Sequence, residues 1–209
     1  MQPCICQNYL SKSRRSLKLL RTFAVLFRAN SPMKILSIAF QNLQSLRGKH
    51  SIRFDEAPLS EASIFAIVGP TGAGKTTILD AISLSLYGKV PRYEAKQAEG
   101  KKLEDVMTRH TGEVWTEIEF EVDGVCYRSR WGRHRAGKKA DGEPQAAKME
   151  LYQFSPTLEL IVDGSSRVPN KIAELTGLGY SQFTRAVILS QGDFAAFLKS
   201  DKDERGELL

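Results

Sequence analysis

The chain has 209 residues and a formal net charge of +6, from 30 Lys and Arg against 24 Asp and Glu. Residues 1–32 hold six of these bases and no acid, which leaves 24 bases and 24 acids in residues 33–209. The basic balance of the whole chain therefore does not indicate a nucleic-acid-binding surface. No apolar stretch reaches the roughly 20 residues that a bilayer-spanning helix needs, and cysteines are few. We expect a cytoplasmic protein with no membrane partner.

The basic leader, residues 1–32, allows three interpretations. Its Arg- and Ser-rich composition without acids is typical of a transit peptide, and the apolar core around Phe23–Phe27 is typical of a signal peptide. In the third, Met33 is the true start and the leader is misassigned upstream sequence. We favour the third interpretation, because Pro32 is followed at once by a well-patterned strand.

Strand patterns open the remaining 177 residues, 33–209. Lys34–Phe40 alternates as a strand does, Lys49–Phe54 is its predicted partner, and residues 41–48 form a polar turn between them. Ser63–Val68 is the short apolar run expected of a buried parallel strand.

Residues 69–76 read Gly-Pro-Thr-Gly-Ala-Gly-Lys-Thr and fit the phosphate-binding P-loop pattern G-x-x-x-x-G-K-[ST]. The three glycines let the backbone curl so that successive N–H groups point at phosphate oxygens. A helix beginning near Lys75 and stopping at Gly88 adds its positive dipole end. Lys75 is expected to reach the β- and γ-phosphates, and the Thr76 hydroxyl to ligate Mg²⁺. The four fixed positions match by chance in under about 1% of chains this long, so the octet predicts nucleotide binding.

Further strands and helices follow. A short helix is predicted over Leu103–Thr108. Val114–Trp131 is the clearest hairpin, with Asp123-Gly124 as its turn. Met149–Phe154 and Thr157–Val162 are predicted to form another strand pair. Three helical patterns come last: Val168–Thr176, which Gly177 ends, then Ser181–Leu189, then Asp193–Leu209.

A run of basic residues begins inside the predicted hairpin. Arg128–Lys139 contains one histidine, no acid and six full positive charges: Arg128, Arg130, Arg133, Arg135, Lys138 and Lys139. On a DNA surface these charges would neutralise phosphates, with a salt-dependent contribution, and Trp131 would stack on a base or on a neighbouring arginine. The alternative is a long, mobile, solvated hairpin loop, as charge runs usually are. We favour the loop and keep DNA contact as the second interpretation.

Five separated motifs stand in order along residues 33–209. They are Met33–Ile38 (MKILSI), Asn42–Leu46 (NLQSL), residues 69–82 (GPTGAGKTTILDAI), Met107–Glu113 (MTRHTGE) and residues 183–194 (FTR, then LSQGDF). Together they resemble the N-terminal ATPase lobe of the bacterial SbcC family, the SMC-like subunits of the SbcCD DNA nuclease.

This resemblance implies the fold class and the partners. The fold would be α/β, a P-loop NTPase, with residues 33–198 as one lobe of an ABC-ATPase-like head that includes an antiparallel β-subdomain. Residues 199–209 would start a coiled-coil arm. Two heads would sandwich two ATP molecules with Mg²⁺ and control an SbcD-like metallo-nuclease subunit on double-stranded DNA ends. The other implied partners are the C-terminal lobe of the full-length chain and a second head.

The resemblance also assigns residues. Gln191 would be the Q-loop residue that contacts Mg²⁺ and the attacking water, because an amide can ligate a cation and orient a water. Gln44 and Ser45 would lie in a turn near the base and ribose, although some relatives carry arginine where Gln44 stands. Lys75 and Gln191 are the catalytic candidates, and Thr76 and Gln191 the Mg²⁺ ligands. The predicted phosphate-binding residues are Gly69, Pro70, Thr71, Gly72, Ala73, Gly74, Lys75, Thr76 and Thr77.

Three motifs of the family are missing from the sequence. It has no apolar run ending in Asp-Glu, no Ser-Gly-Gly signature and no Cys-x-x-Cys. In the family all three lie beyond the first coiled-coil arm. Phosphoryl transfer needs a water-positioning group and a second charge clamp, so we expect this chain alone to bind ATP weakly and to hydrolyse it poorly.

Three other functions compete with this interpretation, and only the last of them stays open. An ABC transporter ATPase is disfavoured, because its signature should follow the Q-loop closely and a long β-subdomain here separates Lys75 from Gln191. A P-loop kinase would need an arginine-bearing lid, for which Lys89–Lys102 is a poor substitute. The third is a truncated lobe that binds nucleotide without catalysis.

Overall fold

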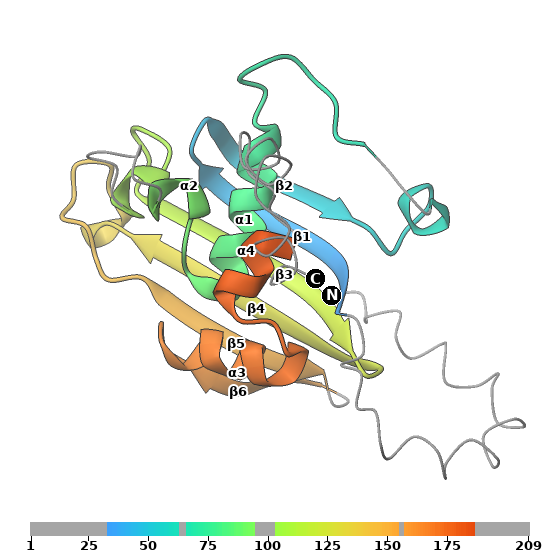
Figure 1. Ribbon diagram of the computed structural model, residues 1–209. Helices are drawn as coiled ribbons and strands as arrows, with labels where there is room; N and C mark the ends of the chain where they lie inside the picture. The colour runs from blue at the N-terminus through green and yellow to red at the C-terminus, as the bar shows by residue number, and fades with distance from the viewer. Residues whose placement is uncertain (1–32, 63–65, 95–102, 155–156, 187–209) are drawn as a thin grey trace, which may run out of the picture.

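An antiparallel six-stranded sheet forms the framework of the molecule (Figure 1). The structure, a computed structural model, describes residues 33–62, 66–94, 103–154 and 157–186. In spatial order the strands are β2 (Leu46–Arg53), β1 (Lys34–Leu43), β3 (Glu113–Val122), β4 (Val125–His134), β5 (Lys148–Phe154) and β6 (Leu158–Asp163). The predicted leader, residues 1–32, and the predicted coiled-coil start, residues 199–209, lie outside the described ranges.

Helices cover one face of this sheet (Figure 1). The α-helices are α1 (Lys75–Tyr87), α2 (Pro91–Glu94), α3 (Arg167–Thr176) and α4 (Tyr180–Ala186), and the 3₁₀ turns are η2 (Leu59–Glu61), η3 (Leu103–Val106) and η4 (Ala136–Lys138). The long helix α1 packs across β1, β3 and β4, while α3 packs on β5 and β6. The helices of the described residues include none that is both long and apolar enough to cross a membrane.

The core lies between the sheet and α1. Every second residue of the central strands faces the helix, so Phe40, Phe120 and Trp131 join Leu84 of α1 in one apolar cluster. Burial of these large side chains is the main favourable contribution that fixes α1 against the sheet. Because α1 begins at the P-loop, the same cluster fixes where the loop stands.

The predicted helix after the P-loop is confirmed. It ends at Gly88, whose φ of 67° is left-handed and whose N–H donates to the Leu84 carbonyl. The pattern over Val168–Thr176 likewise forms α3, capped by left-handed Gly177. Of the pattern over Ser181–Leu189, the described part belongs to α4, which starts one residue earlier, at Tyr180.

The predicted β3–β4 hairpin is also confirmed. Asp123 and Gly124 both have positive φ, 53° and 77°, as a two-residue turn of type I′ requires. The following strand pair forms β5 and β6, and the short helix predicted from Leu103 is the 3₁₀ turn η3.

The β1–β2 turn is tighter than predicted. We expected a polar turn over residues 41–48, but β1 continues to Leu43, β2 starts at Leu46, and only Gln44 and Ser45 connect them. A register shift at Asn42, whose φ is 52°, lets the strand pairing resume between Leu43 and Leu46.

The strand predicted before the P-loop is wrong for its described part. Residues 66–68 are in no strand; the side chains of Ile67 and Val68 are 43% and 85% exposed, and residues 63–65 lie outside the described chain. A parallel strand is buried only where neighbouring strands pair with it. The six described strands pair antiparallel with one another and none of them pairs with residues 66–68.

The prediction that Arg128–Lys139 is a loop is wrong for its first seven residues. Strand β4 extends to His134, three residues beyond the predicted end of the hairpin at Trp131, and only residues 135–139 lie outside the strand. Trp131 faces α1 and is 1% exposed, which excludes stacking on a nucleic-acid base. In β4, buried and more exposed residues alternate from Tyr127 to Trp131. The burial of the Trp131 indole favours the strand even though the neighbouring residues are charged.

Candidate nucleotide-binding site

The P-loop forms a curled segment that runs into the N-terminus of α1. Gly72 and Gly74 have φ of 83° and 88°, a left-handed backbone that side chains disfavour. Gly74 is the N-cap of α1, and a Cβ there would lie 2.9 Å from Leu46 in the β1–β2 hairpin. Glycine at this position is therefore needed both for the turn and for the approach of the hairpin.

Lys75 folds back over this curl. Its Nζ donates hydrogen bonds to the carbonyl oxygens of Gly69, at 2.7 Å, and Pro70, at 2.8 Å. The ammonium thus lies at the mouth of the loop, where it can exchange carbonyl partners for phosphate oxygens. Thr76 is exposed, so its hydroxyl is accessible to a metal ion.

The next residue of the motif is used differently. Thr77 is 3% exposed, and its hydroxyl donates to Gln44 Oε1 at 2.9 Å. Gln44 Nε2 in turn donates to Asp80 Oδ2 at 2.7 Å. The chain of bonds from Thr77 through Gln44 to Asp80 ties the β1–β2 turn to the first turns of α1. Ser45, the other residue predicted near the base and ribose, is exposed beside it.

Sequence reasoning missed Asp80. It lies three residues after Thr77, on the same side of a helix, and is 3% exposed. A buried carboxylate needs a partner, and the sequence holds that signal as an acid inside the apolar run Ile78–Leu86. The sequence holds no indication that its partner stands 36 residues earlier, in the hairpin turn.

A cavity of about 230 Å³ lies between the P-loop and the β1–β2 hairpin. Its lining includes Leu46, His50, Ile67, Gly74, Lys75 and Ile78. The cavity therefore joins the P-loop to an apolar wall of the hairpin, a combination that suits a ligand with an anionic end and a less polar body.

Two of the separated sequence motifs meet at the end of β1. The Gln44 N–H donates to the Val106 carbonyl, at 2.7 Å, and the Thr108 N–H to the Asn42 carbonyl, at 2.9 Å. The motif Met107–Glu113 thus runs beside the motif Asn42–Leu46. A second, polar cavity of about 470 Å³ adjoins it, and its lining includes Tyr93, Asp105, Thr108, Arg109, His110 and Arg135.

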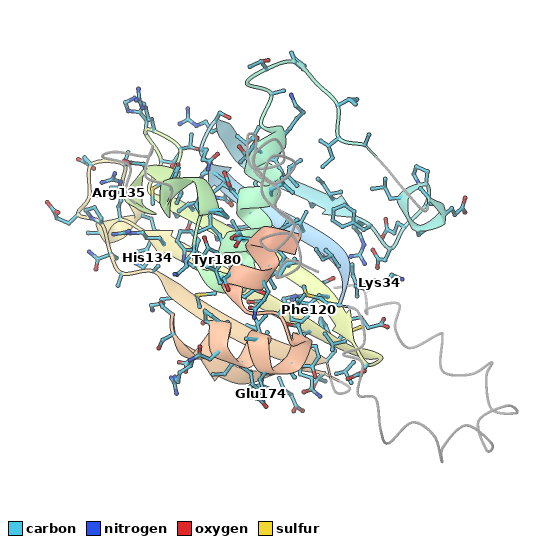
Figure 2. The ribbon with its side chains drawn as sticks, viewed as in Figure 1. Lys34, Phe120, His134, Arg135, Glu174 and Tyr180 are labelled. Carbon is cyan, nitrogen blue, oxygen red and sulfur yellow. The ribbon has the colours of Figure 1, made fainter. Side chains whose placement is uncertain are left out.

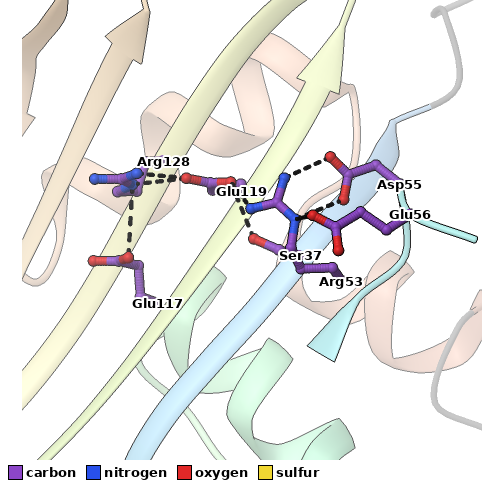
Figure 3. A network of polar contacts seen from close by, with 7 residues as sticks. All are labelled: Ser37, Arg53, Asp55, Glu56, Glu117, Glu119 and Arg128. Atoms are coloured by element: carbon purple, nitrogen blue, oxygen red, sulfur yellow. Dashed lines mark hydrogen bonds and ion pairs between the residues drawn. The ribbon is translucent and has the colours of Figure 1, made fainter. Parts of the chain in front are cut away.

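The opposite face of the sheet carries an ion-pair network (Figure 3). Glu119 accepts from Arg128 Nε at 3.1 Å and from the Ser37 hydroxyl at 3.1 Å, and Arg53 Nη1 lies 3.9 Å away. Arg53 itself is bound by Asp55 at 2.7 Å, and that hydrogen bond raises the pKa of the guanidinium above its ordinary value. The acidic strand face of β3 is thus neutralised by arginines of β2 and β4.

The predicted DNA-contacting residues differ in their surroundings. Arg128 bonds Glu119, Arg130 lies 5.1 Å from the centre of the Trp115 ring, and Arg135, labelled in Figure 2, donates to the Gly142 carbonyl at 3.1 Å. Lys138 bonds Glu113 at 2.8 Å, which lowers the pKa of that carboxyl. Arg133 is partly buried and Lys139 is exposed. The six charges do not form one uniform patch.

Comparison with known proteins places this arrangement in a family. A family model described as an AAA domain matches residues 37–209. The chain belongs to this family. It is 40% identical over 189 residues to the SbcC subunit of the nuclease SbcCD of Pseudomonas aeruginosa, and 40% identical over 190 residues to that of Rhodobacter capsulatus. These matches cover 85% of the chain but only 16% and 15% of the two relatives.

A solved structure supports the fold. One reported as "Structural biochemistry of ATP-driven dimerization and DNA stimulated activation of SMC ATPases" matches with a TM-score of 0.52 and 20% identity, covering 84% of this chain and 96% of that one. The resemblance to SbcC and the predicted fold class are confirmed by these matches. Gln191, the predicted Q-loop residue, lies outside the described residues.

Proposed function

We propose that the chain is the N-terminal ATP-binding lobe of an SbcC-like subunit and that residues 69–77 bind ATP with Mg²⁺. The observation that carries the proposal is the position of Lys75, whose ammonium bonds the Gly69 and Pro70 carbonyls of a loop that contains two left-handed glycines and leads into a buried helix. Backbone N–H groups, helix dipole and lysine then converge on one spot, which suits the phosphates of a nucleotide.

Different residues of the site have different proposed roles. The backbone of residues 69–74 and the Lys75 ammonium hold the phosphates, and the exposed Thr76 hydroxyl ligates Mg²⁺. The Mg²⁺ ion, when bound, neutralises charge between the phosphates. Gln191 orients the attacking water and completes the metal ligands. Ser45 contacts the ribose side, while Gln44 is already bonded to Thr77 and Asp80.

Hydrolysis needs more than these residues. A water-positioning group and a second charge clamp must meet the γ-phosphate, and Lys75 and Gln191 supply only part of that set. We therefore propose that the chain alone binds ATP weakly and hydrolyses it poorly. The C-terminal lobe of a full-length chain and a second head supply the rest, with two ATP molecules at the interface.

The proposed biological role follows the relatives. ATP binding and hydrolysis would be coupled to the processing of double-stranded DNA ends and hairpins by an SbcD-like metallo-nuclease subunit, in repair and recombination. The chain spans 15–16% of the length of these two relatives, so this role is proposed for a protein that includes the lobe.

Nucleotide binding is the first test. A fluorescent ATP analogue is titrated into the chain with Mg²⁺, and Lys75→Ala should weaken binding at least about tenfold, because it removes a charge-assisted contact. Lys148→Ala, which removes the same charge from an exposed residue of β5, is the matched control and should bind as the unchanged chain does. Equal affinities of the Lys75→Ala variant and the unchanged chain would overturn the proposal.

DNA contact by Arg128, Arg130, Arg133, Arg135, Lys138 and Lys139 is the second proposal. The support is uneven: Lys139 is exposed and the half-exposed Arg130 lies 4.0 Å from Glu117, whereas Arg128 would have to give up its close bond to Glu119. In a filter-binding assay with duplex DNA, the double variant Arg130→Gln with Lys139→Gln should bind more weakly. The slope of its affinity against salt concentration should fall by the amount expected for the loss of about two phosphate contacts. An unchanged salt slope would contradict this placement.

A further inference from the structure

Gln44 stands at the junction of three segments. Its side chain accepts a hydrogen bond from Thr77 in the P-loop helix and donates one to Asp80, one turn further on. Its backbone N–H donates to the Val106 carbonyl, just before the motif Met107–Glu113. One residue of the hairpin turn therefore contacts both the nucleotide-binding helix and the neighbouring motif.

The backbone at this junction is strained. Gln44 has a φ of 53°, in the left-handed region that a glutamine rarely adopts, and Asn42 has a φ of 52°. Such conformations persist only where the surrounding contacts hold them. Here they include the two-residue turn between β1 and β2, the backbone bond to Val106 and the two side-chain bonds to α1.

The orientation of the Gln44 side-chain amide is fixed by its two partners. Its oxygen faces the Thr77 hydroxyl and its NH₂ faces the Asp80 carboxylate, so each end meets a group of the opposite kind. Because Asp80 is 3% exposed, water cannot readily replace the NH₂ group. A side chain at position 44 that could only accept would leave the two oxygens facing each other.

From this geometry we infer that Gln44 is a positioning residue: through Thr77 and Asp80 it sets the orientation of the first turns of α1, and so the nucleotide affinity of the P-loop. The inference rests on the proposed nucleotide binding and adds a role for a residue of the β1–β2 turn. Leu46 of the same hairpin lies so close to Gly74 that a Cβ there would come within 2.9 Å of its side chain.

A reciprocal exchange tests the inference. Gln44→Glu places two carboxylates against each other and should weaken binding of a fluorescent ATP analogue about tenfold. Asp80→Asn alone keeps an acceptor for the Gln44 NH₂ group and should change affinity less than about threefold. The double variant Gln44→Glu with Asp80→Asn restores the hydrogen bond with donor and acceptor exchanged, and should return affinity to within about threefold of the unchanged chain.

The rescue separates three outcomes. If Gln44 contacted the base directly, the double variant would bind as poorly as Gln44→Glu, and the inference would fail. If its role were only structural, all variants that circular dichroism shows to be folded would bind equally, and the inference would fail again. Absence of binding by the unchanged chain, and not only by the variants, would overturn the proposed function and with it the coupling to affinity.

A second measurement needs no nucleotide. The rate of amide hydrogen exchange in residues 75–80 should rise several-fold in Gln44→Glu and return to that of the unchanged chain in the double variant. Exchange rates in β4 and β5 should not change. Unaltered exchange in the first turns of α1 would refute the positioning role even if nucleotide binding is confirmed.

Discussion

The two flanks of the P-loop behave in opposite ways. After the loop, α1 is anchored in the core, with Leu84 and Leu86 fully buried. Before the loop, residues 66–68 form no strand, and Val68 is 85% exposed. Both flanks are apolar in sequence, so apolar character alone does not decide which of them is ordered against the sheet.

The difference is one of backbone hydrogen bonding. A helix satisfies its own N–H and C=O groups and needs only a surface for its apolar side. A strand satisfies them through neighbouring strands, and in the described sheet no strand pairs with residues 66–68. The position of the P-loop is therefore set from its helical side.

The largest expected effect tests that conclusion. Leu84→Ala removes a side chain with no exposure from the contact between α1 and the sheet, and should destabilise the chain by about 3 kcal/mol. Urea unfolding followed by circular dichroism measures the change. A loss below about 1 kcal/mol would mean that α1 does not anchor this side of the loop.

Gly74→Ala should have the next largest effect, a loss of about 1–2 kcal/mol in the free energy of unfolding. The backbone at Gly74 is left-handed, which a residue with a Cβ disfavours, and the new Cβ would meet Leu46 at 2.9 Å. Gly69→Ala is the matched control in the same unfolding experiment. Its Cβ would meet only the Ala73 Cβ, at 3.4 Å, and its φ is not left-handed. Equal losses in the two variants would show that the turn at Gly74 is not required.

Tyr87 offers a pH-dependent test at the far end of α1. Burial raises the pKa of its phenol to about 12, and the hydroxyl donates to the Leu178 carbonyl at 2.9 Å. The folded state thus favours the neutral phenol, so this stabilisation is complete below about pH 10, the ordinary pKa of a tyrosine, and is lost as pH rises toward 12. Tyr87→Phe should cost about 1 kcal/mol at pH 7 and make the alkaline loss shallower. Parallel pH profiles of the two proteins would contradict this.

The smallest effect is expected before the loop. Val68→Thr keeps the shape of an exposed side chain and should change the free energy of unfolding by less than about 0.5 kcal/mol. A loss above about 1 kcal/mol in the same urea titration would show that this flank is packed in solution, and the contrast between the two flanks would disappear.

Much of the fold could be predicted from local signals. Asp123-Gly124 marks its turn because both residues adopt positive φ, and Gly88 ends α1 for the same reason. These elements are decided by residues next to one another in the chain. The environment of Trp131 was wrongly predicted because a run of charges around it suggested a loop, whereas its burial depends on α1, more than 40 residues earlier.

In the candidate site, too, local features could be predicted from the sequence and contacts between distant segments could not. The P-loop was predicted from one octet, since its glycines and lysine act through their own backbone and neighbours. The role of Asp80 and the side-chain contacts of Gln44 depend on a pairing between segments 36 residues apart, which periodicity cannot report. The phosphate- and Mg²⁺-binding roles of residues 69–77 stay predictions, as do those of Gln191, Ser45 and the DNA-contacting residues.

The order of the strands has a consequence for how the chain folds. β1 lies between β2 and β3, and its pairing with β3 joins residues such as Ser37 and Glu119, 82 positions apart. The β3–β4 hairpin is local and can close early, whereas the β1–β3 ladder must enclose the whole P-loop and α1, with the entropy cost of a long loop. We expect the P-loop to acquire its final shape in the last and slowest step of folding, when the hairpin that carries Gln44 closes against α1.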